Sequence, residues 1–144
     1  MTYKFLEHTA DIKIAVDEKS LEKAFESSAL AMKEIMLEFE KLKIKSNTSK
    51  ILSIEGKDHG DLLYSFLEEF LYLLDAEDFI LSEIEDIEIS GNEESGFNLS
   101  AKILGDRASN YKFSNKVKAI TFNDMKIECD GKTGSTKLQF VLDV

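Results

Sequence analysis

The sequence predicts an α+β fold in which two helices pack on a mostly antiparallel sheet system. Two segments space their apolar residues by three and four, as amphipathic helices do, and about eight shorter segments alternate apolar and polar residues like half-buried strands. The later strands follow one another without an intervening helix, which is typical of α+β proteins rather than of doubly wound parallel sheets. The 144 residues contain no proline, low-complexity tract or repeat, so a single domain over 1–144 is expected.

Two strands and a helix are expected first. Strand patterns cover residues 3–6 and 11–16, with a polar turn at 7–10 between them. Ser20 is suited to cap the helix that follows, because a serine hydroxyl accepts a hydrogen bond from a free N–H of the first turn. The apolar stripe of this helix consists of Leu21, Phe25, Met32, Ile35, Met36 and Phe39.

A strand over 50–55, preceded by a shorter one near 41–45, leads to the second helix. Asp58 is the expected N-cap, and Asp61 adds negative charge in the first turn, where the helix dipole favours it. Apolar residues surround most of this helix between Leu62 and Leu74. We therefore expect it to be the central buried element of the fold.

The rest of the chain is expected to form strands joined by polar connections. The strands are predicted at 87–89, 97–103, 117–122, 125–129 and 135–144. Turns at Gly91-Asn92 and Asn123-Asp124, and a polar loop over 105–116, would connect them. Cys129, the one cysteine in the sequence, falls on a strand pattern, so a buried and inert thiol is expected and an internal disulfide is excluded.

The charge balance limits the functions that the chain could have. Asp and Glu number 28 against 18 Lys and Arg, which gives a net charge of −10. Autonomous, non-specific nucleic-acid binding needs a positive surface that releases counterions, so the balance argues against this class. Residues 58–94 hold 13 acidic side chains and no Lys or Arg. This segment is either a solvated surface or a docking surface for a basic partner.

The sequence also bears on location. No apolar run is long enough to cross a bilayer. The N-terminus lacks the basic and apolar regions of a secretory signal peptide. We therefore expect no membrane association and a cytoplasmic protein.

One set of oxygen ligands is predicted near the two ends of the sequence. Asp11 follows the polar turn, and Asp143 interrupts an apolar final run just before Val144. If the N- and C-terminal strands pair, the two carboxylates would converge, and with a main-chain or terminal oxygen they would suit a hard divalent cation. The simpler alternative is that both are ordinary surface acids.

Four runs of the sequence are distinctive together: EHTADIKI at 7–14, DLLYSFLEEFLYLLD at 61–75, VKAIT at 117–121 and LDV at 142–144. In this order they resemble the archease family. Archeases are small α+β proteins that assist the RtcB-type RNA ligase, which uses GTP and manganese to join 2′,3′-cyclic-phosphate or 3′-phosphate RNA ends to 5′-hydroxyl ends. The resemblance implies a non-catalytic protein cofactor that promotes ligase guanylylation and multiple turnover in tRNA splicing and RNA repair, and that meets RNA only through the ligase.

The resemblance also implies particular site residues. It assigns Asp11, Asp143 and the main-chain oxygen of Val144 to a divalent metal site of the calcium type. It makes His8 and Lys118 the candidates for ligase activation. The chain departs from the family at two places: Thr121-Phe122-Asn123 stands where archeases often have Thr-Tyr-His, and the loop over 110–115 contains no histidine.

Two other functions remain open. One is a chaperone-like modulator of tRNA-modifying enzymes, a role also proposed for archeases. The other is a stand-alone metal-dependent phosphoesterase, in which an ion at Asp11 and Asp143 would activate water. The phosphoesterase would have no evident general base other than His8, whereas a pure cofactor needs no catalytic set.

Overall fold

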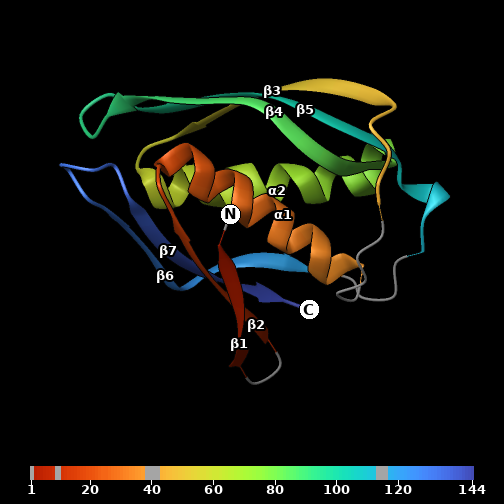
Figure 1. Cartoon of the computed structure of the whole chain (residues 1–144), viewed down its shortest axis with the longest axis horizontal. Helices are drawn as coiled ribbons and strands as arrows, with labels where there is room; N and C mark the ends of the chain where they lie inside the picture. The colour runs from red at the N-terminus through yellow and green to blue at the C-terminus, as the bar shows by residue number, and fades with distance from the viewer. Residues whose placement is uncertain (1, 9–10, 38–42, 113–116) are drawn as a thin grey trace.

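The computed structural model describes residues 2–8, 11–37, 43–112 and 117–144. Within these residues the chain forms two α-helices, one short 3-10 helix and seven strands. The helices lie between a three-stranded sheet and a four-stranded sheet (Figure 1). This arrangement confirms the predicted α+β class with two helices on antiparallel sheets.

The four-stranded sheet carries both ends of the chain. Its strands stand in the order β1, β2, β7, β6, and every neighbouring pair is antiparallel. Their bounds are Tyr3–His8 for β1, Asp11–Glu18 for β2, Thr136–Asp143 for β7 and Ala119–Cys129 for β6. The alternation predicted over 11–16 is confirmed, because Ile14 and Val16 are buried in the core.

The three-stranded sheet covers the opposite side of the helices. It comprises β3 (Thr48–Gly56), β5 (Gly96–Arg107) and β4 (Phe79–Asn92), with β5 in the centre and both pairings antiparallel. Its inner face contributes Leu52, Leu99 and Ile103 to the core. Its outer face is open to solvent, and Ile51 there is 73% exposed.

The first helix, α1 (Leu21–Met36), begins as the sequence predicts. The Ser20 hydroxyl caps it by accepting a hydrogen bond from the Lys23 N–H at 3.1 Å. Small buried residues, Ser28 and Ala29, lie on the helix face that packs against the sheets. The helix contacts β2 and β7 on one side and β4 on the other.

The second helix, α2 (His59–Glu77), occupies the expected central position. Asp58 caps it by accepting from the Asp61 N–H at 2.8 Å, and it ends at Asp78, whose φ of 52° is left-handed. It contacts β3, β4 and β5 of one sheet and β6 of the other. One side of the helix nonetheless faces solvent, where Tyr72 is 56% exposed.

Several predicted boundaries differ from the structure, and the strand predicted at 87–89 begins earlier, at Phe79. Residues 43–45 are irregular rather than strand, and 41–42 lie outside the described residues. The first part of the expected loop at 105–116 is strand, because β5 continues to Arg107 and a 3-10 turn over Ala108–Asn110 follows. The turn expected at Gly91-Asn92 lies at 93–95, where the Asn92 side chain accepts hydrogen bonds from two main-chain N–H groups.

The turn predicted at Asn123-Asp124 is a bulge within one strand. Both halves of β6 pair with β7, through Thr121 with Val141 and Lys126 with Gln139, so residues 122–125 stand opposite Phe140 alone. Asp124 adopts a φ of 56°, and its carbonyl accepts from the Gln139 side chain at 2.7 Å. Asn and Asp tolerate left-handed backbone in turns and bulges alike, which explains why the Asn123-Asp124 pair predicted a chain-reversing turn.

Candidate functional site

Asp11 and Asp143, which the sequence places 132 positions apart, are cross-strand partners. Asp11 is the first residue of β2 and Asp143 the last of β7, and the two Cα atoms are paired in register. Directly opposed residues project their side chains to the same face of a sheet, with Cβ atoms about 5 Å apart. Both residues are half-buried. The structure therefore brings together the two carboxylates that sequence reasoning selected.

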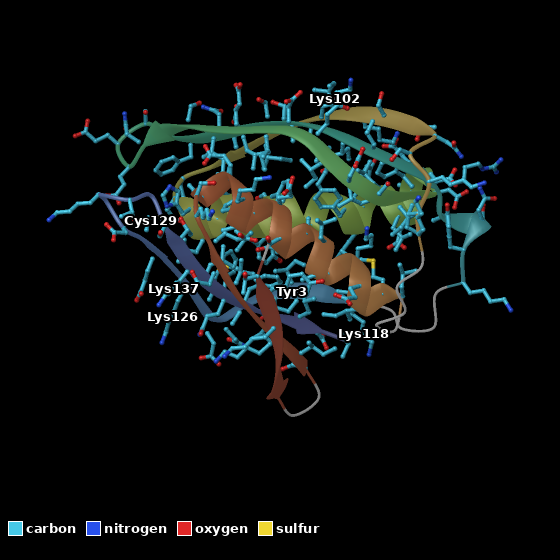
Figure 2. All side chains as sticks on the ribbon, viewed as in Figure 1. Tyr3, Lys102, Lys118, Lys126, Cys129 and Lys137 are labelled. Carbon is cyan, nitrogen blue, oxygen red and sulfur yellow. The ribbon has the colours of Figure 1, made fainter. Side chains whose placement is uncertain are left out.

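Lys118 lies beside the same strand end. Its main-chain N–H donates to the Asp143 carbonyl at 2.8 Å, and the following residue, Ala119, pairs with Asp143 in the β6–β7 ladder. The Lys118 side chain is exposed and lies near the C-terminal end of β7 (Figure 2). Val144 follows Asp143 and packs against the edge of the core. The position of Lys118 is thus fixed by main-chain pairing while its ammonium group faces solvent.

His8 is also brought to this end of the sheet. It is the last residue of β1, and its backbone pairs in register with Asp11. The His8 side chain and residues 9–10 lie outside the described part of the structure. The role proposed for the imidazole therefore stays a prediction.

The ligand chemistry of this strand end suits a hard cation. Two carboxylates on one face of adjacent strands repel each other, and a divalent cation would remove that repulsion. Carboxylate and main-chain oxygens are the ligands that calcium prefers. Within the described residues no group of three or more His, Cys, Asp or Glu side chains could hold a metal. An ion between Asp11 and Asp143 would therefore need a main-chain oxygen, such as that of Val144, together with water or a partner's group.

A third aspartate, Asp106, forms a polar cluster that the sequence does not predict. It is 5% exposed and accepts hydrogen bonds from the Tyr111 hydroxyl at 2.7 Å, the Arg107 N–H at 2.8 Å and the Asn47 side chain at 3.2 Å. These donors, the tyrosine hydroxyl above all, lower the pKa of Asp106 to about 2. The Tyr111 hydroxyl accepts in turn from the Lys45 N–H at 3.0 Å. Asp106 thus ties together the segments before β3 and after β5.

The acidic segment 58–94 extends over α2 and β4. Three of its carboxylates form ion pairs with basic residues outside the segment: Glu77 with Lys50 at 2.6 Å, Glu85 with Lys102 at 3.7 Å and Asp78 with Arg107 at 3.6 Å. Lys102 lies on the three-stranded sheet, away from Lys118 (Figure 2). The exposed acids of β4 are Glu83, Glu85, Asp86 and Glu88. Their placement is compatible with a solvated surface and with a docking surface.

The burial predicted for Cys129 is wrong. The residue ends the edge strand β6 and is exposed, although its sulfur accepts a weak hydrogen bond from the Thr136 hydroxyl at 3.6 Å. An edge strand has a neighbouring strand on one side only, so its side chains can be more exposed than the strand pattern predicts.

Among the residues that the structure describes, no helix is both long enough and apolar enough to span a membrane.

Comparisons with known proteins agree on one family. The model of the Archease protein family matches residues 3–144. The chain is 39% identical over 128 residues to "Protein archease" of Pyrococcus abyssi, covering 88% of this chain and 87% of that protein. It is 38% identical over 144 residues to the Thermococcus kodakarensis archease, covering 99% and 98%.

A solved structure shares the fold. It is the solution structure of protein 1598 from Methanobacterium thermoautotrophicum, which matches with a TM-score of 0.77 at 26% identity. The match covers 99% of this chain and 98% of that one.

Proposed function

The chain belongs to the archease family, and from that premise we propose that it is a non-catalytic protein cofactor of an RtcB-type RNA ligase. In this role it promotes formation of the ligase–guanylate intermediate and thereby repeated turnover in tRNA splicing and RNA repair. RNA is reached only through the ligase, because the chain's net charge of −10 disfavours direct binding to phosphates. We place this activity in the cytoplasm.

One observation carries the proposal. The two most distinctive runs of the sequence, His-Thr-Ala-Asp and the terminal Leu-Asp-Val, meet where Asp11 pairs with Asp143. A third run contributes Lys118, whose N–H is bonded to Asp143. Asp11, Asp143 and Lys118 are polar residues far apart in sequence that share one strand end, and this convergence supports a common task.

We propose that Asp11, Asp143 and the main-chain oxygen of Val144 hold a divalent metal ion, calcium by ligand type. Bound there, the ion would supply positive charge between the two carboxylates and would keep coordination positions open to a ligase group, because calcium takes about six to eight oxygens. The pairing of β2 with β7 sets the two aspartates in register within the chain itself. Because the strand pairing already fixes the positions of the two aspartates, little conformational entropy of these residues would be lost on ligase binding.

We propose that Lys118 and His8 act on the ligase; they flank the Asp11–Asp143 pair on opposite sides, at the same end of the four-stranded sheet. Lys118 offers an exposed ammonium group on a fixed main chain, next to Asp143. A positive charge so placed can stabilise the phosphates of the nucleotide that the ligase accepts, as lysines commonly do. We therefore assign Lys118 to contact with the ligase or its nucleotide.

The test is single-turnover guanylylation of the cognate ligase with and without the chain. The wild type should accelerate guanylylation, whereas Lys118→Ala should fold normally and fail to do so, because exposed substitutions usually cost under about 0.5 kcal/mol. Lys137→Ala is the matched control, since Lys137 is an exposed lysine on β7 of the same sheet. Full stimulation by Lys118→Ala would assign Lys118 to an ordinary surface role.

The same preparation distinguishes the alternative functions. Purified chain without ligase should leave cyclic-phosphate RNA intact, and hydrolysis of that RNA would identify a phosphoesterase instead. Stimulation of a tRNA-modifying enzyme in place of the ligase would identify the chaperone-like function.

A further inference from the structure

One side of α2 carries a row of aromatic and acidic side chains. Tyr64, Glu68 and Tyr72 follow each other at intervals of four, so they lie on one helix face, and Asp75 continues it. Glu68, Tyr72 and Asp75 are exposed. The Tyr64 ring stacks on Phe122 of β6, with centroids 4.4 Å apart and planes inclined by 6°. We call these five residues the aromatic–acidic patch.

The patch holds an unusual amount of exposed apolar surface for this chain. Within the described residues, the exposed large hydrophobic side chains are Ile51, Tyr72 and Phe122, and two of these three belong to the patch. Phe122 is 56% exposed although one of its faces is covered by Tyr64. It lies in the bulge of β6, where it is released from the ladder with β7. Exposed aromatic groups with polar surroundings are typical of protein interfaces.

The charge around the rings determines which partner would fit. In the part of the chain that the structure describes, neither Glu68 nor Asp75 lies within 4.0 Å of a basic nitrogen, unlike Glu77, Glu85 and Asp78 of the same segment. Unpaired carboxylates beside aromatic faces attract guanidinium and ammonium groups, which can form ion pairs and cation–π contacts together. They repel phosphates. The patch therefore suits a basic protein surface and not a nucleic acid.

We propose that the aromatic–acidic patch is a docking surface for the partner ligase, through Arg or Lys side chains set among apolar ones on that protein. This inference rests on the function proposed above and adds a second contact region to it. The first half of β6 connects the two regions, because Phe122 follows Lys118 by four residues, or roughly 13 Å of extended chain. A ligase seated on the patch would thus reach the strand end that carries Asp11 and Asp143.

The test measures the affinity of ligase for full-length chain by titration calorimetry. Tyr72→Ala and Glu68→Lys should each weaken binding about tenfold or more, as removal of an interface anchor does. Ile51→Ala and Glu88→Lys are matched controls: Ile51 is an apolar side chain that is 73% exposed, against 56% for Tyr72, and Glu88 undergoes the same charge reversal in the same acidic segment. Both controls should change affinity less than twofold. Melting temperatures of all four variants should stay near that of the wild type.

The other possible outcomes contradict the docking surface alone or both proposals. If the wild type binds and stimulates the ligase but Tyr72→Ala and Glu68→Lys bind equally well, the docking surface is wrong and the proposed function stands. Equal losses in the patch and control variants would also reject the patch. If the wild type neither binds nor stimulates the ligase, both proposals fail. Binding of a single-stranded RNA oligonucleotide that Tyr72→Ala abolishes would identify RNA as the occupant instead.

Discussion

The carboxylate of Asp106 and the pair formed by Asp11 and Asp143 lie in contrasting environments. Asp106 is nearly inaccessible and receives hydrogen bonds from Asn47, Arg107 and Tyr111, so the chain compensates its charge internally. Asp11 and Asp143 are half-buried and face each other across two strands, so each has a like charge as its register partner. The donors around Asp106 make its carboxylate part of the fold, and the register of Asp11 with Asp143 sets two oxygen ligands opposite each other, an arrangement that a cation can bridge.

The largest effect expected is on the pair. Asp11→Ala and Asp143→Ala should each abolish ligase stimulation and the rise in melting temperature that added calcium gives, since a ligand bound only to the folded state stabilises by mass action. The double variant should be no worse than either single one, because one change already destroys the shared site. Thermal unfolding with and without calcium, beside the guanylylation assay, measures both. Single variants that keep calcium stabilisation and stimulation would make these residues ordinary surface acids.

Asp106→Ala should have the opposite profile. Loss of this carboxylate leaves the Tyr111 hydroxyl and the Asn47 amide without their acceptor, and we expect a melting temperature lower by roughly 5 °C. Ligase stimulation measured well below that temperature should be close to wild type. The exposed Asp86 on β4 offers a control, since Asp86→Ala should change neither property. If Asp106→Ala has the wild-type melting temperature but fails to stimulate the ligase, the distinction between the two sets of acids is wrong.

Asp106 should also make the stability of the fold sensitive to acid. Because hydrogen bonds lower the pKa of Asp106 to about 2, the folded state binds this proton less readily than the unfolded state does. The resulting stability is fully present above the unfolded pKa near 4 and is lost as the pH falls from about 4 towards 2. Urea denaturation across this window should show a shallower loss of stability in Asp106→Asn than in the wild type. Parallel curves for the two proteins would contradict this origin of acid sensitivity.

The smallest effect is expected from the exposed acids of segment 58–94. Their field is screened over roughly 8 Å at physiological ionic strength, so ligase affinity should fall moderately with added salt. Calorimetry at several salt concentrations measures the slope, which Glu68→Lys should reduce. A flat response would leave these acids as a solvated surface.

Local patterns predicted the helices well and the connections poorly. The caps at Ser20 and Asp58 are where the sequence places them, because capping depends on neighbours within one turn. The sequence predicts a turn at Asn123-Asp124 where the structure has a bulge over 122–125, since Asn and Asp favour both and only pairing with β7 distinguishes them. The sequence does not predict the extension of β5 to Arg107, because the hydrogen bonds from Asn47 and Tyr111 that allow Asp106 to be buried in a strand leave no periodic pattern.

The candidate site shows the same division. Asp11 and Asp143 could be selected from the sequence because each interrupts or borders an apolar strand pattern. Their proximity could not be predicted without assuming that the two terminal strands pair, and the β2–β7 register shows that they do. The family resemblance pointed to Lys118, whose main-chain bond to Asp143 no local pattern reveals. The stacking of Tyr64 on Phe122 joins a helix to an irregular part of a strand, so no periodicity could predict it.

The bulge in β6 has a further consequence for how the molecule behaves in concentrated solution. β6 forms an outer edge of its sheet, and such edges can recruit strands from other molecules into aggregates. Here the regular ladder is divided into Ala119–Thr121 and Lys126–Cys129, because residues 122–125 leave it. Neither part is long enough to serve as a good template for an incoming strand. The segment that displays Phe122 therefore also protects this edge against intermolecular strand addition.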